Sequence, residues 1–161
     1  MYSEKAIELL LPELETGLFD DNWRIRLSSV QLLGDLLYRI SGVSGKMSTE
    51  SANEDDNLGT ENCQMAVLAV LGRERRDRVL AGLYMGRSDT ALLVRQAALH
   101  VWKVIVAHTP KMLREIMATL FQLLLGCLAS QSYDKRQVTL ERVYTYIGNT
   151  MNVNPFKGLE M

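Results

Sequence analysis

The stretch DDNWRIRLSSVQLLGDLL, Asp20 to Leu37, joins a helix start signal to an amphipathic helix. Asp20, Asp21 and Asn22 carry side-chain oxygens that can accept hydrogen bonds from the free amides of a first helical turn. Behind them, aliphatic residues recur three and four apart, which is the spacing of one helix face. The stretch therefore predicts a helix from about Trp23 to about residue 40, ended by a Ser-Gly pair.

The same pattern begins at two further arginines. The three segments are RLSSVQLLGDLL from Arg26, RQAALHVWKVIV from Arg95 and RQVTLERVYTYI from Arg136. Short residues mostly follow each arginine two and three places later, and aliphatic or aromatic residues follow at four, seven and eleven. A helix ending in LETGL, VLAGL or LLGCL precedes each segment, and the gaps from its last leucine to the arginine are 8, 12 and 8 residues.

A two-helix unit of about 40 residues is typical of HEAT and armadillo repeats. Such a pair cannot bury its apolar face alone, so copies stack into a solenoid. We therefore predict an all-α fold, an α-solenoid of about three HEAT- or armadillo-like helix pairs within residues 1–150. The expected units are about 5–41, 63–108 and 110–150, and an irregular tail follows at 151–161.

The repeat also predicts which residues are structural. We expect Arg26, Arg95 and Arg136 each to pair with an acid in its own or the neighbouring turn, such as Asp20, Asp89 or Asp134. Helical spacing further predicts two core faces. They are Ile7, Leu10, Leu11, Leu14 and Leu18 in the first helix, and Leu93, Ala97, Trp102 and Ile105 in a helix from 91 to 107.

Residues 41–62 differ in composition from the rest of the chain. They contain five acids, one lysine and three glycines, with almost no large apolar residues. Such a segment buries too little apolar surface to offset the entropy of ordering. We predict a flexible acidic insertion at 42–62, whose role stays open and which is equally consistent with a tolerated surface loop.

Composition limits the possible functions. The chain has 161 residues, is 47% hydrophobic and carries a net charge of −1, so no global charge favours nucleic acid or membrane binding. No basic segment leads into an apolar run at the N-terminus, and the apolar stretch at 120–128 is too short to span a bilayer. Cys63 and Cys127 lack metal-ligand spacing and are expected to be buried free thiols. These features predict a soluble, intracellular chain with no membrane partner.

No motif predicts catalysis. His100 and His108 lie eight residues apart without a nearby cysteine or glutamate motif, so helix-face or core roles are favoured over metal or base roles. The glycines do not form a phosphate-binding loop. We therefore expect no enzyme activity, no catalytic residue, no metal or cofactor, and no small-molecule substrate.

The run GRERRDRVLAGLYMGR, residues 72–87, is the unusual charged feature of the sequence. One interpretation is a solvated helix start whose arginines pair with neighbouring acids. The other is a contact for ribosomal RNA or an acidic partner, because phosphate contacts depend on arginine and lysine. The candidate contact residues are Arg73, Arg75, Arg76, Arg78 and Arg87.

Two longer strings carry a family resemblance. They are LLPELETGLFDDNWRIRLSSVQLLGDLL and RRDRVLAGLYMGRSDTALLVRQAALHVWKVIVAHTPKMLREI, which contain the specific segments GLFDDNWRIR and AGLYMGRSD. Over roughly residues 6–130 the chain resembles the HEAT-repeat translational activators of the general amino-acid-control pathway. After Ser130 the resemblance weakens, and Ala118 stands where the family tends to have proline.

The resemblance implies a non-enzymatic, ribosome-associated scaffold in the cytoplasm. In that family the scaffold activates the amino-acid-starvation kinase and so regulates translation through phosphorylation of initiation factor two alpha, within the integrated stress response. The resemblance places this stretch before the segment that docks the kinase, so direct kinase docking is not expected in this chain. The alternative is a HEAT-repeat adaptor of another kind, serving protein transport or complex assembly.

Overall fold

The computed structural model describes residues 4–42, 56–130 and 136, and all regular structure in these ranges is helical. The five helices are α1 (Glu4–Gly17), α2 (Trp23–Ser41), α3 (Asp56–Gly86), α4 (Leu92–Ile105) and α5 (Thr109–Leu128). The all-α prediction is confirmed. The end of the expected third unit, residues 131–150, and the tail at 151–161 lie outside the described residues, apart from Arg136.

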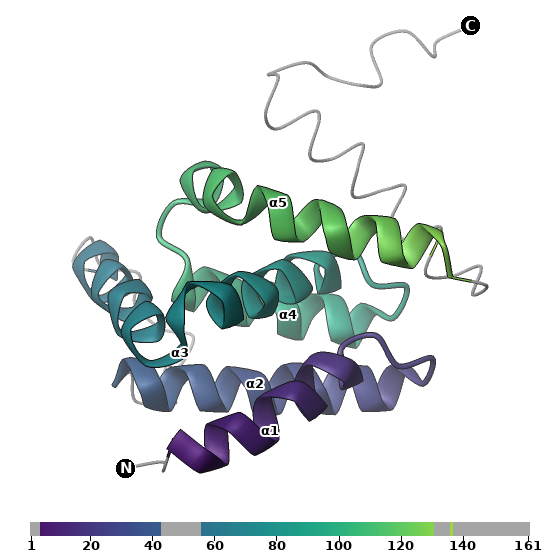
Figure 1. The fold of residues 1–161 in the computed structure, drawn as a ribbon, viewed down its shortest axis with the longest axis horizontal. Coiled ribbons are helices and arrows are strands. Elements are labelled where there is room, and N and C mark those ends of the chain that lie inside the picture. The colour runs from purple at the N-terminus through teal and green to yellow at the C-terminus, as the bar shows by residue number, and fades with distance from the viewer. Residues whose placement is uncertain (1–3, 43–55, 131–135, 137–161) are drawn as a thin grey trace, which may run out of the picture.

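The helices stack in layers, as Figure 1 shows. The pair α1 and α2 lies on one side, α3 and α4 lie in the middle, and α5 lies on the far side of α3. Within the pairs, α1 contacts α2 and α3 contacts α4. Between the layers, α2 packs on both helices of the second pair, and α5 packs on α3. Each helix pair thus covers the apolar face of the next, as the predicted solenoid requires.

The start of α2 follows from its cap. Asn22 has extended backbone angles (φ −83°, ψ 116°), and its side-chain oxygen accepts a hydrogen bond from the Arg24 amide at 3.0 Å. Asp20 Oδ1 in turn accepts from the Asn22 amide at 2.7 Å. The helix ends where Gly42 adopts φ 73°, a left-handed conformation that glycine reaches without the steric cost of a side chain.

Helix α3 consists of two helical halves. Gly72 interrupts it with φ 76° and ψ 166°, a backbone conformation that glycine adopts without the steric cost of a side chain. The helix begins at Asp56, so residues 56–62 are helical where their composition predicts a flexible insertion. The buried side chains of Cys63, Val67 and Leu71 anchor this half, and extending an anchored helix backward costs little because each added residue adds a hydrogen bond.

One apolar core runs through all five helices. Among the largest fully buried side chains are Leu11 in α1, Leu33 in α2, Tyr84 in α3, Trp102 in α4 and Ile116 in α5.

Two expected core residues are not in that core. Leu10 is 47% exposed, because α1 buries the face of Ile7 and Leu11 instead. Leu93 is 51% exposed, because α4 buries Val94 and Ala98, one position further along each turn. The other expected core residues are buried or pack against the core, so the corrections concern two positions and leave the predicted faces in place.

Close glycine contacts set the true register of the repeat. A Cβ on Gly17 would collide with Ser29 of α2, and a Cβ on Gly86 would lie 3.1 Å from the Cβ of Ala98 of α4. Gly17 and Gly86 each precede the repeat arginine by nine residues, and Ser29 and Ala98 each follow it by three. The string equivalent to LETGL is therefore LYMGR (residues 83–87) rather than VLAGL, and the 12-residue gap becomes 8.

Candidate interaction surface

Arg26 connects the first helix pair to the second. Its Nε donates to Asp89 Oδ2 at 2.7 Å and its Nη2 donates to Asp89 Oδ1 at 2.9 Å, which is a bidentate ion pair. Nη1 donates to the carbonyl oxygens of Asp20 at 2.8 Å and Asp21 at 3.1 Å. With 15% and 9% of the Arg26 and Asp89 side chains exposed, the contact is largely shielded from solvent. This arginine therefore ties its own turn to the turn of the next unit.

The other repeat arginines share the bonds to carbonyl oxygens of their own turn. Arg95 Nη1 donates to the carbonyls of Asp89 at 2.6 Å and Thr90 at 3.1 Å. Arg136 Nη1 donates to the Ser130 carbonyl at 3.1 Å. In all three units the arginine binds a carbonyl six residues before it, where a helix end leaves acceptors without an intrahelical partner. The recurring arginine thus acts as a clamp on its turn.

Three of the five candidate arginines lie within ion-pair distance of acids, and Arg76 and Arg78 make the closer contacts. Arg76 is 5% exposed, and it pairs with Asp77 at 2.7 Å and with Glu115 of α5 at 2.9 Å. Arg78 pairs with Glu15 of α1 at 3.1 Å and with Glu74 at 2.8 Å. Both arginines hold helices together across the solenoid. Glu15 and Glu115 lie 63 and 39 residues from their partners, so no local sequence signal identifies them.

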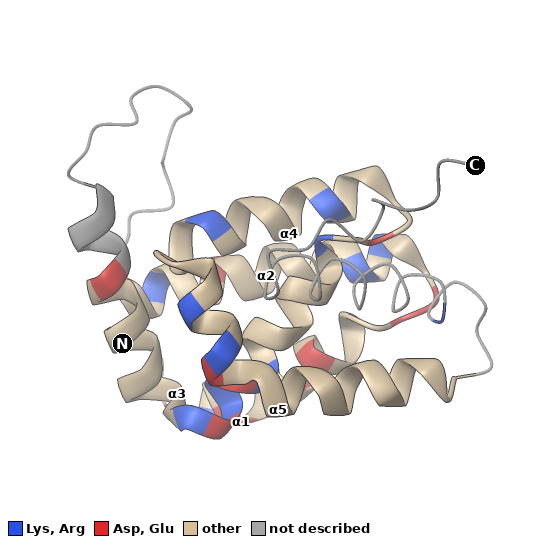
Figure 2. Ribbon diagram, turned by 90° about the horizontal axis from the view of Figure 1, so that it is seen from above, with Lys and Arg blue, Asp and Glu red and all other residues tan. Residues whose placement is uncertain are grey.

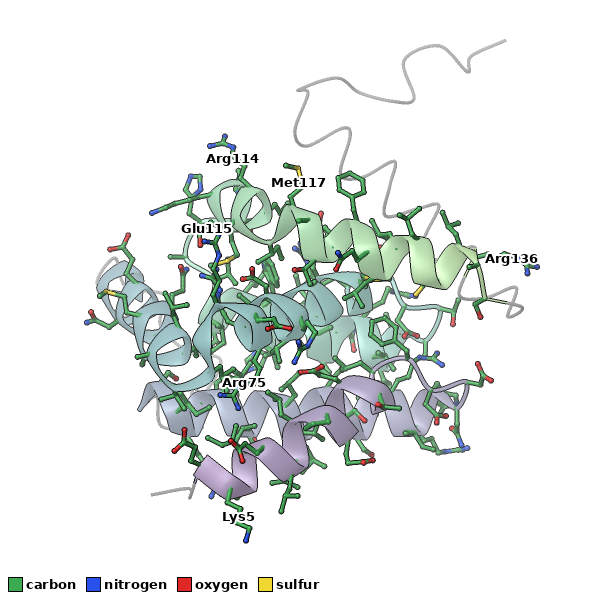
Figure 3. All side chains as sticks on the ribbon, in the orientation of Figure 1. Lys5, Arg75, Arg114, Glu115, Met117 and Arg136 are labelled. Atoms are coloured by element: carbon green, nitrogen blue, oxygen red, sulfur yellow. The ribbon has the colours of Figure 1, made fainter. Side chains whose placement is uncertain are left out.

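Arg73 and Arg75 are the arginines of residues 73–78 that acids hold least. The side chain of Arg73 is 77% exposed, and its Nε lies 4.0 Å from Asp77 Oδ2. Arg75 is partly exposed and its Nε donates to the Leu71 carbonyl at 2.7 Å, at the α1 side of α3 (Figure 3). Figure 2 shows basic and acidic segments interleaved along this part of the ribbon instead of a continuous basic face.

Arg87 lies apart from the other four, at the turn after α3. Its guanidinium carbon lies 5.2 Å from the ring centroid of Tyr84 and 5.5 Å from that of Trp102. The five arginines therefore do not form one patch. They form two buried or half-buried ion-pair groups, one more open pair, and one arginine stacked on aromatic rings.

The histidines and cysteines have structural surroundings. His108 caps α5, and its Nδ1 accepts from the Lys111 amide at 3.2 Å. His100 lies edge-on to Tyr38 with ring centroids 6.5 Å apart. Cys63 is buried and Cys127 is half-buried, and both are free thiols.

Two absences concern only the part of the chain that the structure describes. Within residues 4–42, 56–130 and 136, no three His, Cys, Asp or Glu side chains gather in a way that could hold a metal ion. Across the same ranges, no helix combines the length and apolar character needed to cross a bilayer.

Comparison with known proteins identifies relatives of this fold. The HEAT repeat family matches residues 10–40. "Stalled ribosome sensor GCN1" of Homo sapiens is 69% identical over 138 residues, covering 86% of this chain and 5% of the human protein. "Protein ILITYHIA" of Arabidopsis thaliana is 53% identical over 111 residues, covering 69% of this chain and 4% of that protein.

A more distant relative has a different printed name. "eIF-2-alpha kinase activator GCN1" of Saccharomyces cerevisiae is 44% identical over 142 residues, covering 87% of this chain and 5% of the yeast protein. No solved structure matches the chain significantly. The printed names describe a sensor and an activator rather than enzymes. By sequence and fold, this chain belongs with the HEAT-repeat proteins of the GCN1 kind, and it spans about 5% of the length of those relatives.

Proposed function

We propose that this chain is a non-enzymatic scaffold module in a ribosome-associated activator of the amino-acid-starvation kinase, regulating translation through initiation factor two alpha. The observation that carries the proposal is the 69% identity over 138 residues to a protein named as a stalled ribosome sensor. The stacked helices support it, because a solenoid presents an extended surface to partners without any covalent step. The module acts in the cytoplasm, on ribosomes, and leaves direct docking of the kinase to other segments.

The contact with the ribosome involves Arg73 and Arg75. They are the more open cations of the 72–87 run, while Arg76 and Arg78 are already neutralised by acids. Arg73 is 77% exposed with one long contact to Asp77, and Arg75 bonds a backbone carbonyl, so both guanidiniums can bind a phosphate of ribosomal RNA or an acidic partner. This role excludes Arg76 and Arg78, whose replacement would disturb packing instead of binding.

Co-sedimentation of the tagged chain with ribosomes tests the proposal, with and without amino-acid starvation. The Arg73→Glu/Arg75→Glu double variant is expected to leave the ribosomal fraction, and its binding should weaken steeply as salt rises. The matched control is Arg24→Glu/Lys103→Glu, which reverses two charges at exposed positions of α2 and α4 and should bind as the parent does.

The outcomes separate the two classes of adaptor. A parent chain that stays in the free fraction under both conditions contradicts the ribosome-linked role and favours an adaptor for transport or assembly. A parent that binds ribosomes equally well after Arg73 and Arg75 are reversed contradicts only the assignment of the contact to these arginines.

A further inference from the structure

Arg87 occupies a position that the first unit gives to a leucine. The register set by Gly17 and Gly86 places Leu18 and Arg87 directly after the equivalent glycines. Leu18 is 9% exposed, and a Cβ on Gly82 of α3 would lie 2.8 Å from its Cδ1, so this leucine packs against the next unit. An apolar residue therefore suits this position, and arginine is the exception that needs an explanation.

The guanidinium of Arg87 lies among groups that do not neutralise it. The Tyr84 and Trp102 side chains beneath it are 1% and 2% exposed. The Nε and Nη1 atoms of Arg87 are inaccessible to solvent and have no hydrogen-bond partner. Burial lowers the pKa of Arg87 from its ordinary value, while the nearby Tyr84 hydroxyl acts in the opposite direction. Among the residues that the structure describes, the charge is thus partly desolvated without a counter-ion.

The nearest acid along the chain is already used. The carboxylate of Asp89 accepts two bonds from Arg26 and one from the Ala91 amide at 2.8 Å. Stacking on aromatic rings within 6 Å offsets part of the cost of a buried guanidinium, but it leaves the N–H donors without acceptors. The guanidinium nevertheless stays charged, because arginine side chains are not deprotonated in proteins.

We propose that Arg87, with the rings of Tyr84 and Trp102, forms a binding site for a carboxylate side chain of an acidic partner protein. Arg87 is partly exposed, and Nη2 is not among its buried, unpaired nitrogens, so an anion can reach this nitrogen from solvent. A carboxylate at Nη2 supplies a counter-ion for the guanidinium, which stays stacked on the two rings. Nucleic acid fits less well, because phosphate backbones bind through several cations, and the other arginine of this turn, Arg95, is already bonded to carbonyl oxygens.

Fluorescence of Trp102 provides a direct test. In a Trp23→Phe background, Trp102 is the single tryptophan, and it lies against the Arg87 guanidinium. The probe is an acetylated, amidated hexaglutamate peptide, and a 12-nucleotide oligouridine is the nucleic-acid arm. The peptide is expected to change Trp102 emission with saturation, and Arg87→Leu should weaken its binding at least tenfold. The oligouridine should bind weakly and equally to both proteins.

Thermal unfolding supplies the second readout. Arg87→Leu restores the residue type found at Leu18, so its Tm should rise while peptide binding falls. Arg87→Lys keeps the charge but loses the planar fork, and it should bind the peptide more weakly than the parent. The matched control is Arg114→Leu, which removes the same charge from an exposed site on α5 that points away from α3 (Figure 3), and it should leave peptide affinity within twofold.

Three results would overturn the site. They are failure of the peptide to bind the parent, equal peptide affinity of parent and Arg87→Leu, and oligouridine binding that requires Arg87. A lower Tm for Arg87→Leu than for the parent would show that the guanidinium is already satisfied, which also contradicts the proposal. Because none of these measurements uses ribosomes, they are independent of the contact assigned to Arg73 and Arg75.

Discussion

Arg26 and Asp89, 63 residues apart in sequence, form two parallel hydrogen bonds of 2.7 and 2.9 Å that join the first helix pair to the second. Because both side chains are largely shielded, removing one partner leaves a desolvated charge behind. The same pair also organises both turns, since Arg26 binds the Asp20 carbonyl and Asp89 binds the Ala91 amide. Stability of the array should therefore depend on this contact.

Arg26→Ala is expected to lower the free energy of unfolding by about 2–4 kcal/mol. Asp89→Asn keeps the shape of the side chain but removes its charge, and it should cost about 1–3 kcal/mol. In a double-mutant cycle measured by urea denaturation, the two losses should not add, with a coupling of about 1–3 kcal/mol. Lys103→Ala, at an exposed site on α4, should stay within about 0.5 kcal/mol of the parent. Additive losses would contradict the ion pair.

Gly34→Ala should disturb the contact between α2 and α4. A Cβ at this position would lie 2.7 Å from Cγ2 of Val101, so one helix must shift. We expect a loss of about 1–3 kcal/mol, partly recovered by adding Val101→Ala.

Gly126→Ala is the matched control for this change. It lies within α5 with no atom within 4 Å of the added Cβ, so it should stabilise the chain by about 0.5 kcal/mol through helix propensity. Equal effects of the Gly34 and Gly126 substitutions on urea denaturation would contradict the close approach of α2 and α4.

Arg76→Met separates packing from binding in the basic run. The arginine is 5% exposed and bridges Asp77 and Glu115, so its loss should cost about 2–4 kcal/mol in urea denaturation. Arg73→Met, at a side chain that is 77% exposed, should change stability by less than about 0.5 kcal/mol. If both variants unfolded at the same urea concentration, the division of the run into structural and open arginines would be wrong.

The Tyr38 hydroxyl should lose its proton at a higher pH than a tyrosine in water. Burial, and secondly the negative charge of Asp35, raise the pKa of this hydroxyl to about 12. The folded chain therefore holds this proton more tightly than the unfolded chain, where the pKa is about 10. The resulting contribution to stability is complete below pH 10 and is lost as the pH rises from 10 toward 12.

Ultraviolet titration of the parent against Tyr38→Phe tests this expectation. The difference between the two curves should rise near pH 12, and the variant should lose less stability than the parent between pH 10 and 12. A difference curve centred near pH 10 would show that the hydroxyl is in water.

Local signals in the sequence predict most of the helices, although not the first turns of α3, which begins at Asp56. The Asn22 cap, the glycine after Ser41 and the break at Gly72 act within one or two turns, so their effects follow from short stretches. The repeat of arginine with short residues behind it was also visible, and it predicted the solenoid.

The sequence pattern could not determine how the helices face one another. Leu10 and Leu93 have the spacing of core residues, yet packing placed their neighbours inward. The string VLAGL looked equivalent to LETGL, but Gly82 contacts Leu18 of the preceding unit, whereas Gly17 contacts Ser29 of its own unit. A shifted register leaves hydrophobic periodicity almost unchanged, so only the contacts distinguish the alternatives.

The sequence by itself determined the helical class, the helix ends and the kinship with GCN1-like proteins, because caps, periodicity and identity are properties of the chain. Only the tertiary structure decided which arginines are used in folding. Arg26, Arg76 and Arg78 find acids 39 to 63 residues away, while Arg87 is stacked on two rings without an acceptor. The physical reason is that the free energy of a charge depends on its burial and partners, and folding brings those partners together from distant parts of the chain.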